Sequence, residues 1–426
     1  MTSEKIVLPY GRETVAVEIE EGHLAGVLRS GIHGYRPPAT GEELVRVAMA
    51  QPIGTPRLRE LAAGKRKVVV IASDHTRPVP SRVIMPQMLA EIRTGNPSAD
   101  ITILVATGLH RTTTLDELAT KFGDEIVARE RIVVHDCDDT ANLVNIGRLP
   151  SGGDLVVNRL AVEADLLVAE GFIEPHFFAG FSGGRKSILP GVASRKTVMA
   201  NHCSEFIASD CSRTGILKGN PIHKDMVWAA RQAKLRFICN VVIDSEKKAI
   251  YAVSGDLEKA HEKGCSFLSD LCGARKKIAD IVITTNGGYP LDQNIYQSVK
   301  GMTAAEASVR DGGVIIMLAA CNDGHGGQSF FDQLANAEDL DSAMDEILSR
   351  GRDRTIPDQW EAQILIRILR KAHVILVSEA PDEMVRAMHM TPADSLKQAM
   401  EIAEKILGNG KATVTAIPDG VSVMVL

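Results

Sequence analysis

Short apolar runs alternate with polar, glycine-rich segments along most of the chain. Five of these runs have the length and the β-branched composition of buried strands, and turn-forming residues follow each of them. They cover residues 67–72, 100–106, 164–169, 280–285 and 313–319. Because each run leads into a loop rich in Gly, Asn, Asp, His or Arg, the pattern predicts a series of strands whose ends carry polar side chains.

Other patterns predict the elements around these strands. Strand and helix alternate from about residue 65 to residue 245, as a parallel sheet requires. We therefore expect an α/β fold with two α/β domains and mostly parallel sheets, divided into residues 1–275 and 276–426. The further predicted elements are a hairpin at residues 6–11 and 14–19, helices from Thr40 and over residues 257–273, and strands at residues 374–377 and 412–417.

The composition narrows the class of protein. With 426 residues, of which 45% are hydrophobic, the chain can bury more than one core. Its net charge is −6 and its basic residues are scattered, which argues against a nucleic-acid partner. No apolar run approaches the roughly twenty residues that span a bilayer, and the first residues lead into a strand pattern rather than a signal sequence. We expect a cytoplasmic protein without a membrane partner.

The seven cysteines are an odd number and show no Cys-x-x-Cys spacing. This pattern indicates neither a disulfide framework nor a structural zinc site. Most are expected to be inert thiols, and Cys203 differs from the others in lying beside His202. The cysteines are Cys137, Cys203, Cys211, Cys239, Cys265, Cys272 and Cys321.

The loops after the predicted strands carry the candidate chemistry. Open parallel α/β sheets bind ligands beyond the carboxyl ends of their strands, so we expect these loops to share one site. Because they come from both halves of the chain, that active site is expected in the interdomain cleft. Polar strand ends also serve solubility and capping, which is the alternative for each loop taken singly. The residues of interest are Asp74, His75, Thr76 and Arg77; His110; residues 286–294 with Tyr296, Gln297 and Lys300; and residues 321–327.

The densest loop runs from residue 174 to residue 187 and holds His176, Lys186 and several glycines. It is similar to a phosphate loop, but that consensus requires glycine where Arg185 stands. A neighbouring cation makes an amine more nucleophilic, which favours a nucleophilic or covalently tethered Lys186 over a solvated one. His202, which follows Asn201, is either a metal ligand or half of a satisfied polar pair.

Taken together, these stretches resemble the lactate racemase family, which uses a nickel-pincer nucleotide. The resemblance covers most of the chain, and we find no departure at a position that the family needs. Its most specific parts are residues 174–186 and 287–294. It implies an isomerase in which residues 1–275 form the cofactor-binding domain. The matching stretches are residues 74–78, 108–111, 174–190, 201–202, 286–306 and 358–360.

The resemblance also implies the cofactor, the Ni(II) complex of pyridinium-3,5-bisthiocarboxylic acid mononucleotide. Lys186 would be its covalent tether, and His202 would be the protein's ligand to nickel, since neutral imidazole suits a nickel ion whose other donors are soft. Cofactor-maturation enzymes would be partners. The further residues implied at the cofactor are Asp74, His75, Thr76, Arg77, Gln297 and Lys300, and those implied at the substrate are Arg77, Lys300, Tyr296 and Trp360.

The implied reaction interconverts the enantiomers of a small 2-hydroxy acid, with D- and L-lactate as the first choice. Hydride transfer from Cα to the cofactor leaves a planar 2-keto acid, which can take the hydride back on either face. One base is needed for each enantiomer. His110 and His176, which follow different strands, are the expected pair.

Several alternatives stay open. A cofactor-independent two-base racemase would use both histidines but leave Lys186 and His202 without a role. A nicotinamide dehydrogenase needs a Gly-x-Gly-x-x-Gly turn after a strand, which we do not find. A non-enzymatic carrier of the nickel cofactor would leave His110 and His176 without a role. Racemisation or epimerisation of another 2-hydroxy acid is a further alternative, since one substitution can change the side-chain preference of a pocket.

Overall fold

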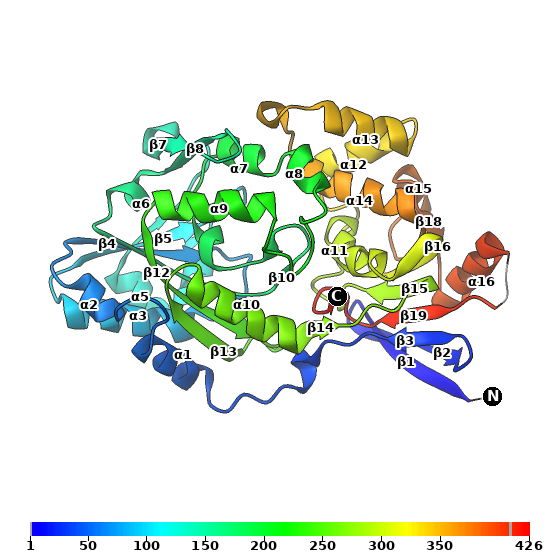
Figure 1. Ribbon diagram of the computed structural model, residues 1–426, viewed down its shortest axis with the longest axis horizontal. Coiled ribbons are helices and arrows are strands. Elements are labelled where there is room, and N and C mark those ends of the chain that lie inside the picture. The colour runs from blue at the N-terminus through cyan, green and yellow to red at the C-terminus, as the bar shows by residue number, and fades with distance from the viewer. Residues whose placement is uncertain (1, 409–410) are drawn as a thin grey trace. The chain divides into compact units, whose positions relative to one another are not determined.

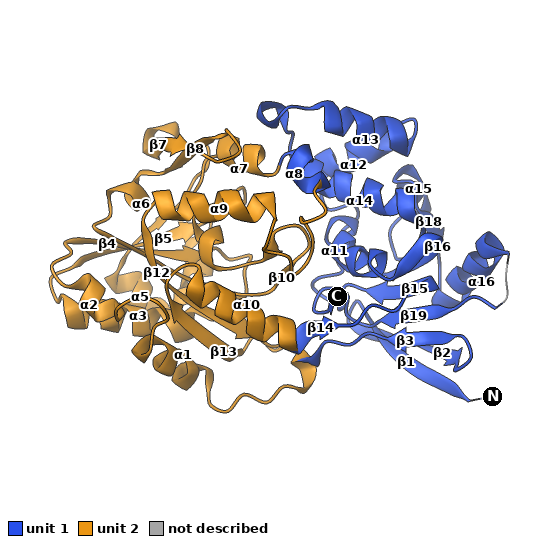
Figure 2. Cartoon of the chain, viewed as in Figure 1, with its two compact units in different colours: residues 1–31, 203–208, 271–426 blue, residues 32–202, 209–270 orange. Residues whose placement is uncertain are grey.

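Two sheets, each covered by helices, organise the protein (Figure 1). The structure is a computed structural model that describes residues 2–408 and 411–426. The chain divides into two compact units (Figure 2): unit 1 comprises residues 1–31, 203–208 and 271–426, and unit 2 comprises residues 32–202 and 209–270. Both large sheets are mostly parallel, which confirms the predicted α/β fold.

Unit 2 is built on a six-stranded sheet with the strand order β13-β12-β9-β4-β5-β6. Neighbouring strands run parallel except at one edge, where β13 pairs antiparallel with β12. The strands are β4 (Lys67–Ser73), β5 (Asp100–Ala106), β6 (Arg131–Val134), β9 (Leu166–Phe172), β12 (Leu235–Ile243) and β13 (Ala249–Gly255). The helices are α1 (Gly41–Ala50), α2 (Leu58–Ala62), α3 (Ser81–Gly95), α4 (Leu115–Phe122), α5 (Asp124–Arg129), α6 (Arg159–Glu163), α7 (Arg195–Asn201), α9 (Pro221–Gln232) and α10 (Lys259–Cys272). Two small hairpins, β7 (Leu143–Arg148) with β8 (Asp154–Asn158) and β10 (Pro175–His176) with β11 (Gly180–Phe181), and the 3-10 turn η3 (Gly184–Ser187) complete this description.

The strands predicted in this half are confirmed as β4, β5 and β9, and the predicted helices are confirmed as α1 and α10. Thr40 caps α1, because its hydroxyl accepts the N–H of Glu43 at 3.3 Å. The strand predicted from residue 164 begins two residues later, at Leu166. Asp165 stands outside it because its carboxylate accepts the N–H of Lys67 at 2.8 Å, which joins the start of β9 to the start of β4.

The order of the strands in unit 2 creates a point where the chain reverses direction across the sheet. From β4 the chain moves outward through β5 to β6, and it then returns to the other side of β4 as β9. The loops that follow β4 and β9 therefore leave the sheet at its topological switch point, which is where open α/β sheets bind ligands. The β5 loop lies next to them, since β5 pairs with β4.

Unit 1 holds a second six-stranded sheet, entirely parallel, with the order β18-β17-β16-β15-β19-β3. Its switch point lies between β15 and β19, so residues 286–294 leave the sheet at the equivalent place. The strands are β3 (Leu24–Val27), β15 (Ala279–Thr285), β16 (Val309–Leu318), β17 (His373–Val377), β18 (Thr391–Ala393) and β19 (Val414–Ile417). The helices are α8 (Ser204–Ala208), α11 (Ile295–Glu306), α12 (Gln328–Ala335), α13 (Leu340–Ser349), α14 (Gln359–Lys371), α15 (Asp382–Ala387) and α16 (Leu396–Leu407), and the short strands β14 (Gly273–Ala274) and β20 (Met424–Val425) pair with each other.

The N-terminal hairpin belongs to the core of unit 1. β1 (Ser3–Tyr10) and β2 (Glu13–Glu20) form the predicted hairpin, and Ile6 and Leu8 are fully buried in the same cluster as Ile283 of β15 and Ile316 of β16. Residues 1–31 and 203–208 therefore group with the C-terminal half, although the sequence divided the chain at residue 275. The predicted strands of this half correspond to β15, β16, β17 and β19.

A separate core supports the sheet of unit 2. Val70, Ile103 and Val168 of its three central parallel strands are fully buried, and Met85 and Met88 of α3 pack against them. This packing holds the carboxyl ends of β9, β4 and β5 in fixed register. Among the residues that the structure describes, no helix combines the length and the apolar character needed to cross a membrane.

Candidate functional site

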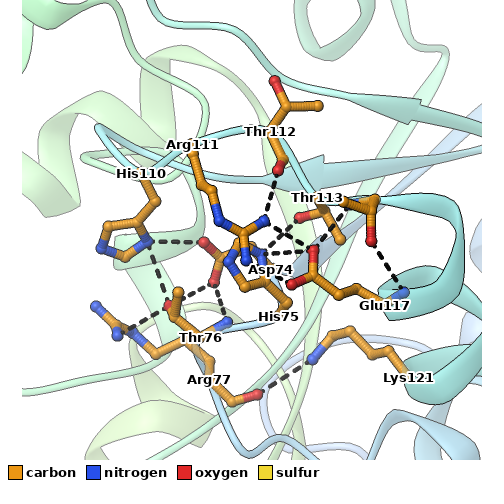
Figure 3. Close-up of polar contacts among 11 residues, drawn as sticks. Asp74, His75, Thr76, Arg77, His110, Arg111, Thr112, Thr113, Glu117 and Lys121 are labelled. Carbon is orange, nitrogen blue, oxygen red and sulfur yellow. Dashed lines mark hydrogen bonds and ion pairs between the residues drawn. The ribbon is translucent and has the colours of Figure 1, made fainter.

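An aspartate–histidine pair joins the loops after β4 and β5 (Figure 3). Nδ1 of His110 lies 2.7 Å from Oδ2 of Asp74, and Oδ1 of Asp74 accepts the hydroxyl of Thr76 at 2.7 Å. Burial alone would raise the pKa of the Asp74 carboxyl, but the hydrogen bonds from His110 and Thr76 and the charges of His110 and Arg77 lower it below its usual value. An ionised Asp74 fixes the proton of His110 on Nδ1 and presents Nε2 as the basic nitrogen.

His75 and its neighbours form a second polar cluster on the same two loops (Figure 3). Nδ1 of His75 lies 3.0 Å from the Thr113 hydroxyl and 3.7 Å from Oε2 of Glu117. Glu117 in turn accepts two hydrogen bonds from Arg111, at 2.9 and 2.6 Å. The hydrogen bonds from Arg111 and from the backbone of Thr114 lower the pKa of Glu117 to about 2, so its charge persists through the physiological range.

Arg77 projects from the exposed end of the β4 loop. Its Nη1 donates to the Thr76 hydroxyl at 3.1 Å, and its carbonyl accepts a hydrogen bond from Nζ of Lys121 at 3.3 Å (Figure 3). Burial lowers the pKa of Lys121, while the charges of Glu170 and Asp74 oppose that shift. Lys121 thus connects α4 to the loop that carries the predicted cofactor-binding residues.

The β10–β11 hairpin presents His176 after β9. His176 pairs with Gly180, and its Nδ1 accepts the N–H of Ala179 at 3.3 Å. In the neutral ring this contact places the proton on Nε2, which is the tautomer opposite to that of His110. Phe177 stacks on the imidazole with ring centroids 5.1 Å apart, and Phe178 meets it edge-on at 4.5 Å.

Lys186 and His202 both lie close to the Phe178 ring. Nζ of Lys186 is 5.9 Å from the ring centroid, and the imidazole of His202 meets the same ring edge-on at 5.2 Å. Burial, and to a smaller extent the charge of Lys186, lowers the pKa of His202 to about 3. His202 is therefore neutral, and its Nδ1 donates to the carbonyl of Val198 at 3.1 Å, so a metal ion would bind through Nε2.

The side chain of Arg185 is turned away from solvent and holds the segment that ends in Lys186. It is completely buried, and its guanidinium donates to the carbonyls of Ala179 at 2.7 Å, Gly183 at 3.2 Å and Ser182 at 3.3 Å. Its Nε donates to Nδ1 of His223 at 3.0 Å. Burial lowers the pKa of Arg185 to about 10, which still leaves it charged near neutral pH. The sequence singled out Arg185 as a charge beside the lysine, whereas its contacts make it the anchor of the loop.

The two glycines before Arg185 are required by close packing. Both have positive φ, 79° at Gly183 and 55° at Gly184. A Cβ at Gly183 would lie 2.7 Å from the carbonyl oxygen of Phe172, and one at Gly184 would lie 2.9 Å from the ring of His261.

A hydrogen bond connects the β5 loop to the chain just after Lys186: the N–H of Gly108 donates to the carbonyl of Gly191 at 3.0 Å. The loops after β4, β5 and β9 thus form one connected group.

The remaining predicted residues lie together in unit 1, near the first turns of α11 and α14. Nζ of Lys300 donates to Oε1 of Gln297 at 2.6 Å, and the hydroxyl of Tyr296 donates to Oδ1 of Asp358 at 3.3 Å. Trp360, two residues after Asp358, is 9% exposed. The structure therefore brings the predicted residues together in two groups, one in each unit, and the shared interdomain site stays a prediction.

Sequence reasoning missed Glu361, which follows Trp360 and has no exposed surface. It stands in a helix whose first ten residues are buried at nearly every position. An acidic residue within such a segment is a signal that could have been noticed, because apolar residues normally fill these positions.

Comparisons with known proteins cover nearly the whole chain. The model of the lactate racemase N-terminal domain matches residues 10–215, and that of the lactate racemase C-terminal domain matches residues 274–425. The lactate racemases of Thermoanaerobacterium thermosaccharolyticum and Lactiplantibacillus plantarum are 56% and 53% identical to the chain over 421 residues, which is 99% of the chain and 99% of each relative.

Two solved structures are similar to the chain. The lactate racemase apoprotein from Thermoanaerobacterium thermosaccharolyticum superposes with a TM-score of 0.96 at 56% identity, covering 99% of this chain and 100% of that one. A protein from Thermotoga maritima superposes with a TM-score of 0.64 at 20% identity, covering 91% of this chain and 99% of that one, which shows a shared fold alone.

Proposed function

The chain belongs to the lactate racemase family and is an isomerase, and from this premise we propose that it interconverts D- and L-lactate by reversible hydride transfer to a nickel-pincer nucleotide tethered at Lys186. The observation that carries the proposal is the pair of histidines with opposite tautomers on two loops, after β5 and after β9, at the same edge of one sheet. Nδ1 of His110 is held by Asp74, and Nδ1 of His176 accepts a backbone N–H.

The residues of unit 2 fit such a cofactor. His202 is buried, neutral and oriented through Nδ1, as imidazole ligands of metals usually are. Lys186 follows a loop that Arg185 holds rigid, so its amine has a defined position for covalent attachment. Hydrogen-bonding groups for a ribose and a phosphate are present on Asp74, His75 and Thr76. Arg77 adds an exposed positive charge. When bound, the cofactor would supply an electrophilic pyridinium carbon for the hydride.

The chain's own residues would move the hydroxyl proton of the substrate. His110 has Nε2 as its basic nitrogen, so it can accept that proton while Asp74 stabilises the imidazolium. The neutral ring of His176 carries its proton on Nε2. To deliver a proton to the oxygen of the planar 2-keto acid, His176 must first be protonated to the imidazolium, and the transfer returns it to the neutral ring. With the proton positions exchanged, the same two histidines serve the reverse direction, since the base for one enantiomer is the acid for the other.

The proposal also assigns residues to the substrate. Arg77 and Lys300 provide positive charges for its carboxylate, and Gln297 orients Lys300 through their 2.6 Å hydrogen bond. Tyr296 and the nearly buried Trp360 offer apolar surface suited to a small neutral side chain such as the methyl group of lactate.

The cofactor must be made and inserted, so we propose maturation enzymes as partners and the cytoplasm as the compartment.

Mass spectrometry, metal analysis and an activity assay test the proposal on protein co-produced with those enzymes. We expect a mass increment located on Lys186, nickel close to one per chain, and conversion of either lactate enantiomer into the racemic mixture. Loaded protein with nickel but no racemisation of lactate would point to another 2-hydroxy acid, and active protein without adduct or nickel would contradict the cofactor.

A further inference from the structure

A completely buried carboxyl group lies next to the proposed carboxylate-binding residues of α11. Glu361 stands in the first turn of α14, and neither of its oxygens has a hydrogen-bond partner among the described residues. An ionised carboxylate in such a position loses its hydration without compensation, which is strongly unfavourable. A neutral side chain of the same size would be better tolerated there, so the presence of glutamate calls for a functional reason.

Three ionisable groups face Glu361. Lys300 and Tyr296 come from α11, and Asp358 immediately precedes α14. Several other charged groups on α14 and on the elements packed against it form ion pairs with one another, and Asp332 of α12 and Asp345 of α13 are in none of these pairs. These pairs are Glu306 with Arg367, Asp341 with Arg370, Glu346 with Arg350, and Glu205 with Arg352.

The balance of these groups places the ionisation of Glu361 close to neutral pH. Burial raises its pKa to about 8, the positive charge of Lys300 opposes the shift, and the negative charge of Asp358 adds to it. The partial positive charge of the first helical turn also keeps the ionised form accessible. Since burial raises the pKa of this acid, the neutral form of Glu361 persists to higher pH than that of an exposed glutamate, and the carboxylate forms as the pH rises further.

We propose that Glu361 sets the positive charge that Lys300 offers to the substrate carboxylate, and that it is therefore a positioning residue for substrate binding. As a neutral acid, Glu361 leaves the charge of Lys300 to the substrate. As a carboxylate, it competes with the substrate for the same ammonium group. The inference rests on the proposed function in one respect, because it takes Lys300 as the residue that binds the substrate carboxylate.

The first test follows KM for lactate against pH in cofactor-loaded enzyme. In the wild type, KM should rise on the order of tenfold between about pH 7 and pH 9.5, because the ionised Glu361 weakens carboxylate binding. In Glu361→Gln the amide keeps the size of the side chain and cannot ionise, so KM should stay nearly constant. The ratio of kcat values between the two enzymes should change little over this range.

A matched control removes a different carboxylate between the same two helices. Glu306 of α11 pairs with Arg367 of α14 at 2.7 Å, and Glu306→Gln should weaken this contact while keeping the rise of KM seen in the wild type. The comparison separates loss of an ionisable group at position 361 from loosened packing of α11 on α14.

The second test does not depend on activity or cofactor. Infrared difference spectra of the apoprotein should show a buried protonated carboxylic acid at about pH 6.5 that ionises by about pH 9.5. This band should be absent from Glu361→Gln and present in Glu306→Gln.

The outcomes separate the inference from the proposed function. A wild-type KM that is constant up to about pH 9.5, or a Glu361→Gln profile that matches the wild type, would overturn the role of Glu361 even with racemisation intact. So would the absence of the infrared band from the wild type, which needs no variant. Enzyme that shows the titrating acid but does not racemise lactate would instead count against the proposed function.

Discussion

The hydrogen bond between Asp74 and His110 is the single contact on which the proposed proton transfer depends most. Asp74→Asn removes the negative charge that fixes the His110 tautomer and stabilises its imidazolium. We expect kcat for racemisation to fall by about 10²–10⁴-fold, as for carboxylates that orient catalytic histidines elsewhere, with a smaller change in KM. The surface variant Asp138→Asn, which loses an ion pair with Arg195, should keep normal kcat. A kcat for Asp74→Asn within about twofold of the wild type would show that the contact has no catalytic role.

Lys186 is the residue on whose chemistry the proposed cofactor depends most directly. Lys186→Arg keeps a positive charge but replaces the nucleophilic amine with a guanidinium, which does not form the proposed covalent bond under ordinary conditions. After co-production with the maturation enzymes, intact mass should show no adduct, and racemisation should be nearly lost. Lys196→Arg, a change at an exposed lysine that pairs with Asp154, should retain both. An adduct of unchanged mass in Lys186→Arg would exclude Lys186 as the tether.

The sequence names candidate site residues, but it carries less information about the contacts that hold them. His176, Lys186 and His202 stand in stretches whose residue types and spacing point to chemistry. The role of Arg185 could not be predicted, because it depends on carbonyls and histidines that other segments bring to its guanidinium. The same holds for Glu361, whose pKa is set by burial in α14 and by Lys300 on another helix.

Among the structural elements, the segment from residue 179 to residue 186 depends on one buried side chain. Arg185→Lys supplies one donor group where Arg185 reaches three carbonyls and His223, so several buried acceptors lose their hydrogen bonds. We expect the free energy of unfolding to fall by about 2–4 kcal/mol, and each kcal/mol lowers Tm by roughly 2–4 °C. Attachment of the cofactor should also be slower. Thermal unfolding of the apoprotein and the time course of the adduct measure the two effects.

A comparable change at the surface provides the control. Arg195→Lys alters an arginine that pairs with Asp138 and should leave Tm and attachment nearly unchanged. An Arg185→Lys protein as stable as this control would mean that the loop is held by other contacts.

The strands were the most predictable elements. β4, β5, β9 and β15 appear within two residues of their predicted starts, because continuous β-branched runs are a local property of the sequence. Such local runs do not predict which segments of the chain join each compact unit. Ile6 and Leu8 join a core in which every other buried member except Ile19 lies more than 270 residues further along the chain, and short-range periodicity carries no information about such contacts.

For the whole molecule, the central claim is that hydrogen leaves the substrate Cα as hydride and returns from the cofactor. A cofactor-independent enzyme would use the same two histidines on Cα itself and exchange its proton with water. The two mechanisms share His110 and His176, so variants of these residues do not distinguish them. The fate of the Cα hydrogen does.

The most direct measurement is racemisation of lactate deuterated at Cα in ordinary water, followed by mass spectrometry of both enantiomers. The hydride mechanism predicts that deuterium stays on Cα through many interconversions, because the transferred hydrogen does not meet solvent. Loss of deuterium to water at the rate of racemisation would contradict hydride transfer, even in nickel-loaded protein, and would favour two-base proton transfer.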